Sequence, residues 1–159
     1  FKAYTTRVGE GPFPTELFDD DGAKMQDIGK EYGATTGRPR RCGWFDGVAA
    51  KYSCMVNGLT QIALTKLDIL DEFSTIKICT GYKIDNKVTA CFSEVLHTLD
   101  KVEPIYTEFD GWNIATTEMK SFDELPDNTK KYINFIVDYI DTPIDIISIG
   151  PGRNQIIQL

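Results

Sequence analysis

The sequence is poor in the residue patterns that hold metals or form disulfides. It has one histidine, His97, and four cysteines without a Cys-x-x-Cys pair among them. Zinc sites need several His, Cys, Asp or Glu ligands at short spacings, so neither a zinc site nor a disulfide scaffold is indicated. Widely spaced cysteines fit reduced thiols in a cytoplasmic protein. The cysteines are Cys42, Cys54, Cys79 and Cys91.

Long apolar runs and an excess of positive charge are also missing. No stretch reaches the roughly 18 apolar residues that cross a bilayer, and the first residues lack a signal pattern. The formal net charge is −7. Nucleic acids and membrane surfaces need a basic face, so we expect neither as a partner, and any anionic ligand should be small.

A phosphate-binding loop of the form Gly-x-x-x-x-Gly-Lys-Ser/Thr is absent as well. This absence argues against a switch-type GTPase, which needs that loop. The chain has 159 residues, 42% of them hydrophobic, enough for one sizeable core. It opens at Phe1 without a methionine, so we expect a single domain, residues 1–159, that is a piece of a longer protein.

What the sequence does contain is a concentration of arginines beside Gly and Thr, in the run GATTGRPRR at residues 33–41. Guanidinium groups make two-point contacts with phosphate or carboxylate, hydroxyls add hydrogen bonds, and glycine lets the backbone approach closely. The run therefore predicts a site for a small anion. The alternative is a solvated loop whose arginines pair with nearby Asp or Glu.

Two short apolar runs, at residues 61–65 and 144–149, end in polar loops. The carboxyl ends of buried parallel strands form the ligand-binding edge of α/β sheets. After the first run, the Asp68 carboxylate could accept the ring N–H and the exocyclic amine of guanine, while the Lys66 stem covers the base. A surface ion pair is the alternative for these two residues.

Periodicity and turn signals predict an α/β fold: a mixed sheet with parallel strands carrying the motif loops, an antiparallel meander and flanking helices. The first helix should end at Gly33, a plausible C-terminal glycine. The expected elements are a loop at residues 1–18, helices at 20–32, 46–57 and 126–142, and strands at 61–65, 74–84, 88–92, 102–109 and 144–149.

Four segments taken together resemble the C-terminal part of the adenylosuccinate synthetase family. In order, they are TRVGEGPFPTE at 6–16, GATTGRPRRCGW at 33–44, LTKLD at 64–68 and IISIGP at 146–151. The resemblance covers essentially the whole chain. It implies a GTP-dependent ligase of purine nucleotide (AMP) biosynthesis that condenses IMP with L-aspartate through 6-phosphoryl-IMP. It also implies Mg²⁺, a cytoplasmic homodimer, and no nucleic acid or membrane partner.

Carried over by matching motif positions, the resemblance implies two ligand sites. A threonine loop would close on aspartate. Arg38 would contact the aspartate carboxylate and the IMP ribose, and Arg40 would reach aspartate and the GTP phosphates. The implied aspartate and IMP residues are Val8, Gly9, Thr35, Thr36, Gly37, Arg38 and Arg40, and the implied GTP residues are Arg40, Lys66, Leu67, Asp68, Ser148, Ile149 and Gly150.

The family's phosphate loop, catalytic Asp and His, and metal ligands lie in an N-terminal half that this sequence lacks. We therefore expect no catalytic or metal-binding residue here, and no activity from the chain alone. His97 is expected to be a surface or packing residue. Pro39 stands where the family often has a basic residue, and Glu10 adds an acid beside the implied IMP site.

A second interpretation is a non-catalytic guanine-nucleotide-binding or oligomerisation module that kept the fold and lost the chemistry. A module of that kind would be free to lose the ligand-binding residues. The two threonines, Arg38, Arg40, Lys66 and Asp68 are all present, which favours the enzyme.

Overall fold

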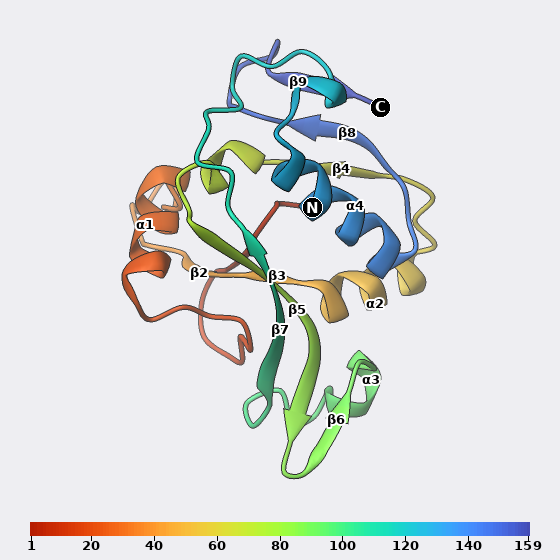
Figure 1. Cartoon of the computed structure of the whole chain (residues 1–159). Coiled ribbons are helices and arrows are strands. Elements are labelled where there is room, and N and C mark those ends of the chain that lie inside the picture. Colours follow the sequence, from red (N-terminus) through yellow and green to blue (C-terminus); the bar gives the residue numbers. More distant parts are fainter.

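Three small sheets form the framework of the computed structural model, which describes residues 1–159 (Figure 1). The four-stranded sheet consists of β3 (Phe45–Asp46), β5 (Thr75–Ile84), β6 (Lys87–Thr89) and β7 (Glu103–Asp110). The three-stranded sheet consists of β4 (Ile62–Leu64), β8 (Ile144–Ser148) and β9 (Ile156–Gln158). The two-stranded sheet pairs β1 (Thr5–Arg7) with β2 (Arg41–Gly43).

Four α-helices and two 3₁₀ turns complete the chain. The predicted α/β class with parallel and antiparallel pairs is confirmed. The helices are α1 (Asp20–Gly29), α2 (Gly47–Asn57), α3 (Phe92–Val95) and α4 (Asp127–Ile140), and the turns are η1 (Leu67–Leu70) and η2 (Phe122–Glu124).

The two long central helices begin and end where their cap residues predict. In α2, the Asp46 side chain accepts a hydrogen bond from Ala49 N, and Gly58 ends the helix at φ 59°. Helix α4 follows Pro126, and its apolar stripe is buried. A helix that buries one face in this way is held mainly by packing rather than by propensity.

Helix α1 ends earlier than the sequence predicts. Asp19 caps its first turn by accepting from Gly22 N, as the acidic run indicates. Its last turn closes at Lys30, which adopts φ 50°, so Gly33 is not the cap. The early turn sends the side chain of Glu31 into the interior, where it is fully buried.

The predicted meander and parallel strands are confirmed, but the strand expected at residues 88–92 ends at Thr89, and Phe92 begins α3. Strands β5 and β6 form an antiparallel hairpin, β7 pairs antiparallel with β5, and this group extends away from the main body together with α3 (Figure 1). Strands β4 and β8 pair in parallel, with Leu64 opposite Ile147. Their carboxyl ends therefore lie side by side, as expected for the ligand-binding edge of an α/β sheet.

Residues 1–18 are not all loop, which corrects one expectation. Thr5–Arg7 forms β1, and before it Ala3 N donates to Thr65 O at 2.8 Å. The glycines and prolines that predicted a loop all come after β1, so they do not prevent Thr5–Arg7 from pairing as a strand. The N-terminal segment thereby pairs with β2 on one side and with the residue after β4 on the other. Both β2 and β4 belong to motif-bearing segments.

Candidate functional site

The residues implied to bind GTP, apart from Arg40, lie at the carboxyl ends of β4 and β8. Lys66 and Asp68 follow β4 at the start of η1, and η1 contacts β8. At the end of β8, Ser148 Oγ donates to Gly150 O at 3.1 Å. The side chains of Leu67 and Ile149 are fully buried in the core, so only their backbone atoms could face a nucleotide.

Residues 33–40 form the Gly-Thr-Arg loop, which is closed at its base and exposed at its tip. Gly33 N donates to Arg38 O at 2.9 Å, and Gly37 N donates to Gly33 O at 2.8 Å. Thr36 Oγ1 accepts from Arg38 N at 3.3 Å. The backbone of Gly37 has φ 64°, a conformation that glycine adopts without strain. Thr35, Thr36, Gly37 and Arg38 are all exposed.

Arg41 has a structural role, so the ion-pair alternative is correct for this arginine. Its guanidinium donates from Nε and Nη2 to the two carboxylate oxygens of Glu16. Its Nη1 donates to Gly9 O at 3.1 Å and to Gly11 O at 2.8 Å. Arg41 thus fixes the loop that carries Val8 and Gly9, where Val8 is 72% exposed.

Arg38 is in the opposite situation. Its side chain is 67% exposed, and its only ion pair is with Glu10, at 3.9 Å between Nη2 and Oε1. The Glu10 carboxylate is itself almost completely exposed. Solvent screens such a pair strongly, so the guanidinium of Arg38 is available to a ligand.

Arg40 and Lys66 meet at one buried carboxylate, that of Glu31. Glu31 Oε1 accepts from Lys66 Nζ at 2.6 Å, Lys2 Nζ at 2.9 Å and Tyr4 Oη at 2.5 Å. Glu31 Oε2 accepts from Arg40 Nη1 at 2.8 Å. The side chain of Glu31 is fully buried, whereas Arg40 and Lys66 are each 34% exposed.

Glu31 stays ionised because of these donors. Burial alone raises the pKa of the carboxyl, but hydrogen bonds from Lys66, Tyr4, Lys2 and Arg40 outweigh it and lower the pKa from 4.5 to about 2. One carboxylate thus faces three cations. The cluster keeps an excess of positive charge, and its partly exposed members offer this charge to an anionic ligand.

Acid should weaken the fold through Glu31. Because the folded-state pKa is depressed, the stabilisation is complete above about pH 4.5 and is lost as the pH falls toward about 2. The shift corresponds to about 3 kcal/mol. Urea unfolding of the chain and of Glu31→Gln across this range should show their difference in unfolding free energy shrinking by about this amount.

The matched control for this measurement is Glu108→Gln, because the Glu108 side chain is 61% exposed and pairs only with Lys77. This variant should differ from the parent chain by less than about 1 kcal/mol at every pH. A Glu31→Gln difference that does not change with pH would contradict the depressed pKa.

Asp68 and Asp71 are two nearby carboxylates with different environments. Burial raises the pKa of both carboxyls. Asp71 accepts from Trp112 Nε1 at 2.7 Å and from the backbone and hydroxyl of Thr116, so its oxygens are in use. The carboxylate of Asp68 receives no hydrogen bond from another residue, and Asp68 lines a cavity of about 320 Å³. Asp68 is therefore the carboxylate that remains free to accept from a ligand.

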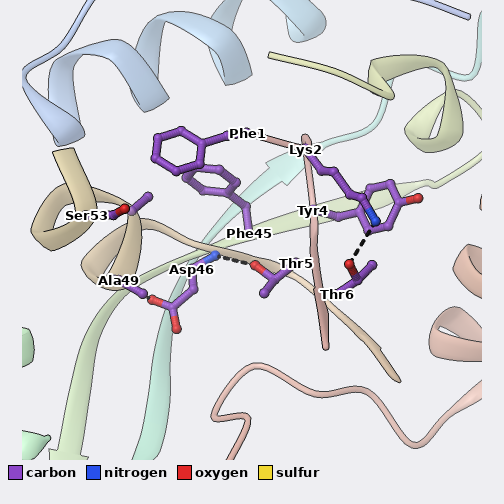
Figure 2. Close-up of a pocket in the computed structure, with 10 residues that line it drawn as sticks. Phe1, Lys2, Tyr4, Thr5, Thr6, Phe45, Asp46, Ala49 and Ser53 are labelled. Atoms are coloured by element: carbon purple, nitrogen blue, oxygen red, sulfur yellow. Dashed lines mark hydrogen bonds between the residues drawn. The ribbon is translucent and has the colours of Figure 1, made fainter. Parts of the chain in front are cut away.

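A separate cleft of about 450 Å³ lies between β1 and α2 (Figure 2). Across it, Asp46 N donates to Thr5 Oγ1 at 3.1 Å, and Lys2 Nζ donates to Thr6 Oγ1 at 2.8 Å. None of the implied ligand residues lines this cleft. Lys2 connects the cleft to the Glu31 cluster, since its ammonium also reaches Glu31.

Sequence reasoning missed Glu31, Lys2 and Tyr4. Their partners lie far apart along the chain, so no local spacing marks them. One signal was available: a cluster of arginines needs a counter-charge, and Glu31 lies two residues before Gly33, where the run of glycine, threonine and arginine begins. The residues described contain no group of three or more His, Cys, Asp or Glu side chains that could hold a metal ion. No helix of the structure is both long and apolar enough to span a membrane.

The chain is an α/β protein in which polar loops follow the carboxyl ends of two paired parallel strands, the edge at which open α/β sheets commonly bind ligands. The fold is similar to that of fully ligated adenylosuccinate synthetase from Plasmodium falciparum, with a TM-score of 0.93 and 41% identity. That match covers 99% of this chain and 38% of the other. The family model for adenylosuccinate synthetase matches residues 1–157. The chain belongs to the adenylosuccinate synthetase family, whose members are ligases.

Curated relatives from distant organisms give the same result. The adenylosuccinate synthetase of Alkaliphilus metalliredigens is 54% identical over 156 residues, which is 98% of this chain and 36% of the relative. That of Komagataella phaffii is 52% identical over 157 residues, 99% of this chain and 37% of the relative. The chain thus spans little more than a third of the length of these relatives.

Proposed function

We propose that this chain is the substrate- and GTP-binding C-terminal portion of an adenylosuccinate synthetase. The whole enzyme would condense IMP with L-aspartate, using GTP, and release adenylosuccinate, GDP and phosphate in purine nucleotide biosynthesis. Family membership over nearly the whole chain supports this assignment. The same proposal includes a cytoplasmic homodimer as the working form.

One observation carries the proposal: Arg40, implied for aspartate and the GTP phosphates, and Lys66, implied for guanine, donate to the same buried carboxylate of Glu31. This shared partner supports placing the aspartate side and the guanine side of the site next to each other, as transfer between GTP and a second substrate requires. Arg38 and Asp68 next to them have no strong partner within the chain. Unpaired charged groups around a shared cluster are typical of a ligand site rather than of a surface.

The aspartate and IMP side of the site would be the exposed loop at residues 33–38 together with Val8 and Gly9. Arg38 would bind the aspartate carboxylate and the IMP ribose, and Thr35 and Thr36 would close on aspartate. Arg40 would neutralise aspartate and the charge that develops on the transferred phosphoryl group. Positive groups aimed at developing charge are commonly a large contribution to catalysis.

The guanine side would be the edge formed by Lys66, Leu67, Asp68, Ser148, Ile149 and Gly150. Asp68 would accept from the ring N–H and the exocyclic amine of guanine, a donor pair that adenine lacks. Lys66 holds its ammonium against Glu31 and Gly29 O, at 2.6 and 2.7 Å, which leaves its methylene stem to cover the base.

Magnesium does not fit the acidic residues of this chain, because they form no ligand cluster. We propose that the metal, the phosphate-binding loop and the catalytic Asp and His belong to the remainder of the enzyme. This chain would contribute the binding and orientation of aspartate, IMP and the guanine base through Arg38, Arg40 and Asp68.

The test compares the full-length enzyme with the 159-residue chain. The full-length enzyme should convert IMP, aspartate and GTP to adenylosuccinate, whereas the chain alone should show no turnover. Failure of the full-length enzyme to form adenylosuccinate would overturn the proposed function, and turnover by the chain alone would overturn its assignment as an incomplete part. GTP-selective binding without any turnover by the full-length protein would favour a non-catalytic guanine-nucleotide-binding module.

A further inference from the structure

We propose that Glu31 is a positioning residue that sets Arg40 and Lys66 together and so makes aspartate binding and GTP binding depend on one carboxylate. This role rests on the proposed function, because it assigns Arg40 and Lys66 to those ligands. Glu31 itself is fully buried and would touch neither substrate.

The cluster joins segments that are remote in sequence. Lys2 and Tyr4 come from the N-terminal segment, Arg40 from the end of the Gly-Thr-Arg loop, and Lys66 from the turn after β4. Glu31 lies between them because Lys30 turns the chain inward after α1. A single carboxylate is therefore the shared anchor of two ligand-bearing segments.

Arg40 is tied to Glu31 through both its backbone and its side chain. Arg40 N donates to Glu31 O at 2.8 Å, and Nη1 donates to Oε2, also at 2.8 Å. No other hydrogen bond uses the remaining guanidinium donors, and a third of the side chain is exposed. Glu31 thus fixes the direction of the guanidinium while leaving part of its fork for an anion.

Lys66 is held just as tightly. Its backbone adopts φ 61°, an uncommon conformation for a lysine, and its ammonium reaches both Glu31 Oε1 and Gly29 O. This combination directs the ammonium inward and leaves the stem along the surface. The orientation of the Lys66 methylene stem, which would cover the base, therefore depends on the negative charge of Glu31.

Charge, more than shape, is what the cluster needs from Glu31. A glutamine at this position would keep the volume and lose the negative charge, so Lys2, Arg40 and Lys66 would repel one another around a neutral group. Arg40 and Lys66 would then move apart, toward solvent. Displacement of a binding group by about 1 Å can cost on the order of 100-fold.

IMP binding serves as an internal reference for the effect of Glu31 on aspartate and GTP binding. Neither Val8 nor Gly9 forms a hydrogen bond with Glu31, and Arg38 pairs with Glu10 instead. Loss of the Glu31 charge should therefore affect aspartate and GTP and largely spare IMP. A general loss of structure would affect all three substrates together, or would only reduce the active fraction.

The experiment is steady-state kinetics of Glu31→Gln in the full-length enzyme. We expect the KM for aspartate and the KM for GTP each to rise at least about tenfold, with the KM for IMP within about threefold of the parent enzyme. Glu108→Gln is the matched control, because this exposed carboxylate on β7 pairs only with Lys77 and should leave all three constants unchanged.

A parallel rise in all three KM values, a change in only one of the aspartate and GTP constants, or a fall in kcat alone would overturn the positioning role. Should Glu31→Gln fail to fold, the double variant Lys2→Met/Glu31→Gln removes one cation with the carboxylate, and the same pattern is expected from it. An inactive parent enzyme would instead contradict the proposed function, and the role of Glu31 would fall with it.

Discussion

Replacement of Arg38 by leucine in the full-length enzyme is expected to raise the KM for aspartate by roughly 100- to 1000-fold and to change the KM for GTP by less than about threefold. Arg38 is exposed, and its only ion pair is a long one to Glu10. Its removal therefore costs the fold little. The lost interaction is the charge-assisted contact with the aspartate carboxylate, which leucine cannot replace.

The matched control for Arg38→Leu is Lys83→Leu. Lys83 is a half-exposed cation on β5 whose only ion pair is also with an exposed carboxylate, Glu103 at 3.6 Å. Lys83 belongs to the hairpin of β5 and β6, and it makes no ion pair with any of the implied ligand residues. The control should keep the aspartate constant of the parent. An unchanged aspartate KM in Arg38→Leu would remove Arg38 from the site.

The second large effect is expected from Asp68→Asn in the full-length enzyme. An asparagine keeps one acceptor oxygen and places an N–H₂ group against a guanine donor. GTP binding should weaken, and the preference for GTP over ATP should fall by roughly 5- to 150-fold, which corresponds to about 1–3 kcal/mol. The stability of the fold should change little, because the side chain of Asp68 makes no hydrogen bond to another residue.

Competition between GTP and ATP in the turnover assay measures this preference directly. Asp138→Asn makes the same change of charge at an exposed position on α4 and serves as the control. Asp71→Asn would be a poor control because Asp71 holds Trp112 and Thr116. Undiminished discrimination against ATP in Asp68→Asn would show that another group recognises guanine.

Much of the fold could be predicted because its signals are local. Asp46 and Gly58 bound α2, and Pro126 precedes α4. The apolar runs that became β4 and β8 also predicted a parallel pair. The failures had tertiary causes. Pairing with residues near 42 made a strand of Thr5–Arg7, and the inward turn at Lys30 ended α1 before Gly33.

The candidate site was predictable in its composition and not in its internal pairing. The sequence indicated Arg38, Arg40 and Asp68 from residue type and motif. It could not separate Arg38, which is nearly free, from Arg41, which is fully bonded to Glu16 and the Gly9 loop. It gave no indication of Glu31 as the common partner, because donors at positions 2, 4, 40 and 66 come together only in the folded chain.

The parallel pairing of β4 with β8 also has a kinetic consequence. Ile62 is opposite Ile144, so the intervening hairpins and α4 must lie within the loop that this pair closes. Closing so long a loop is entropically costly, and contacts of this kind slow folding. The hairpin of β5 and β6 can form early by itself, whereas the guanine-binding edge is expected to assemble among the last parts of the molecule.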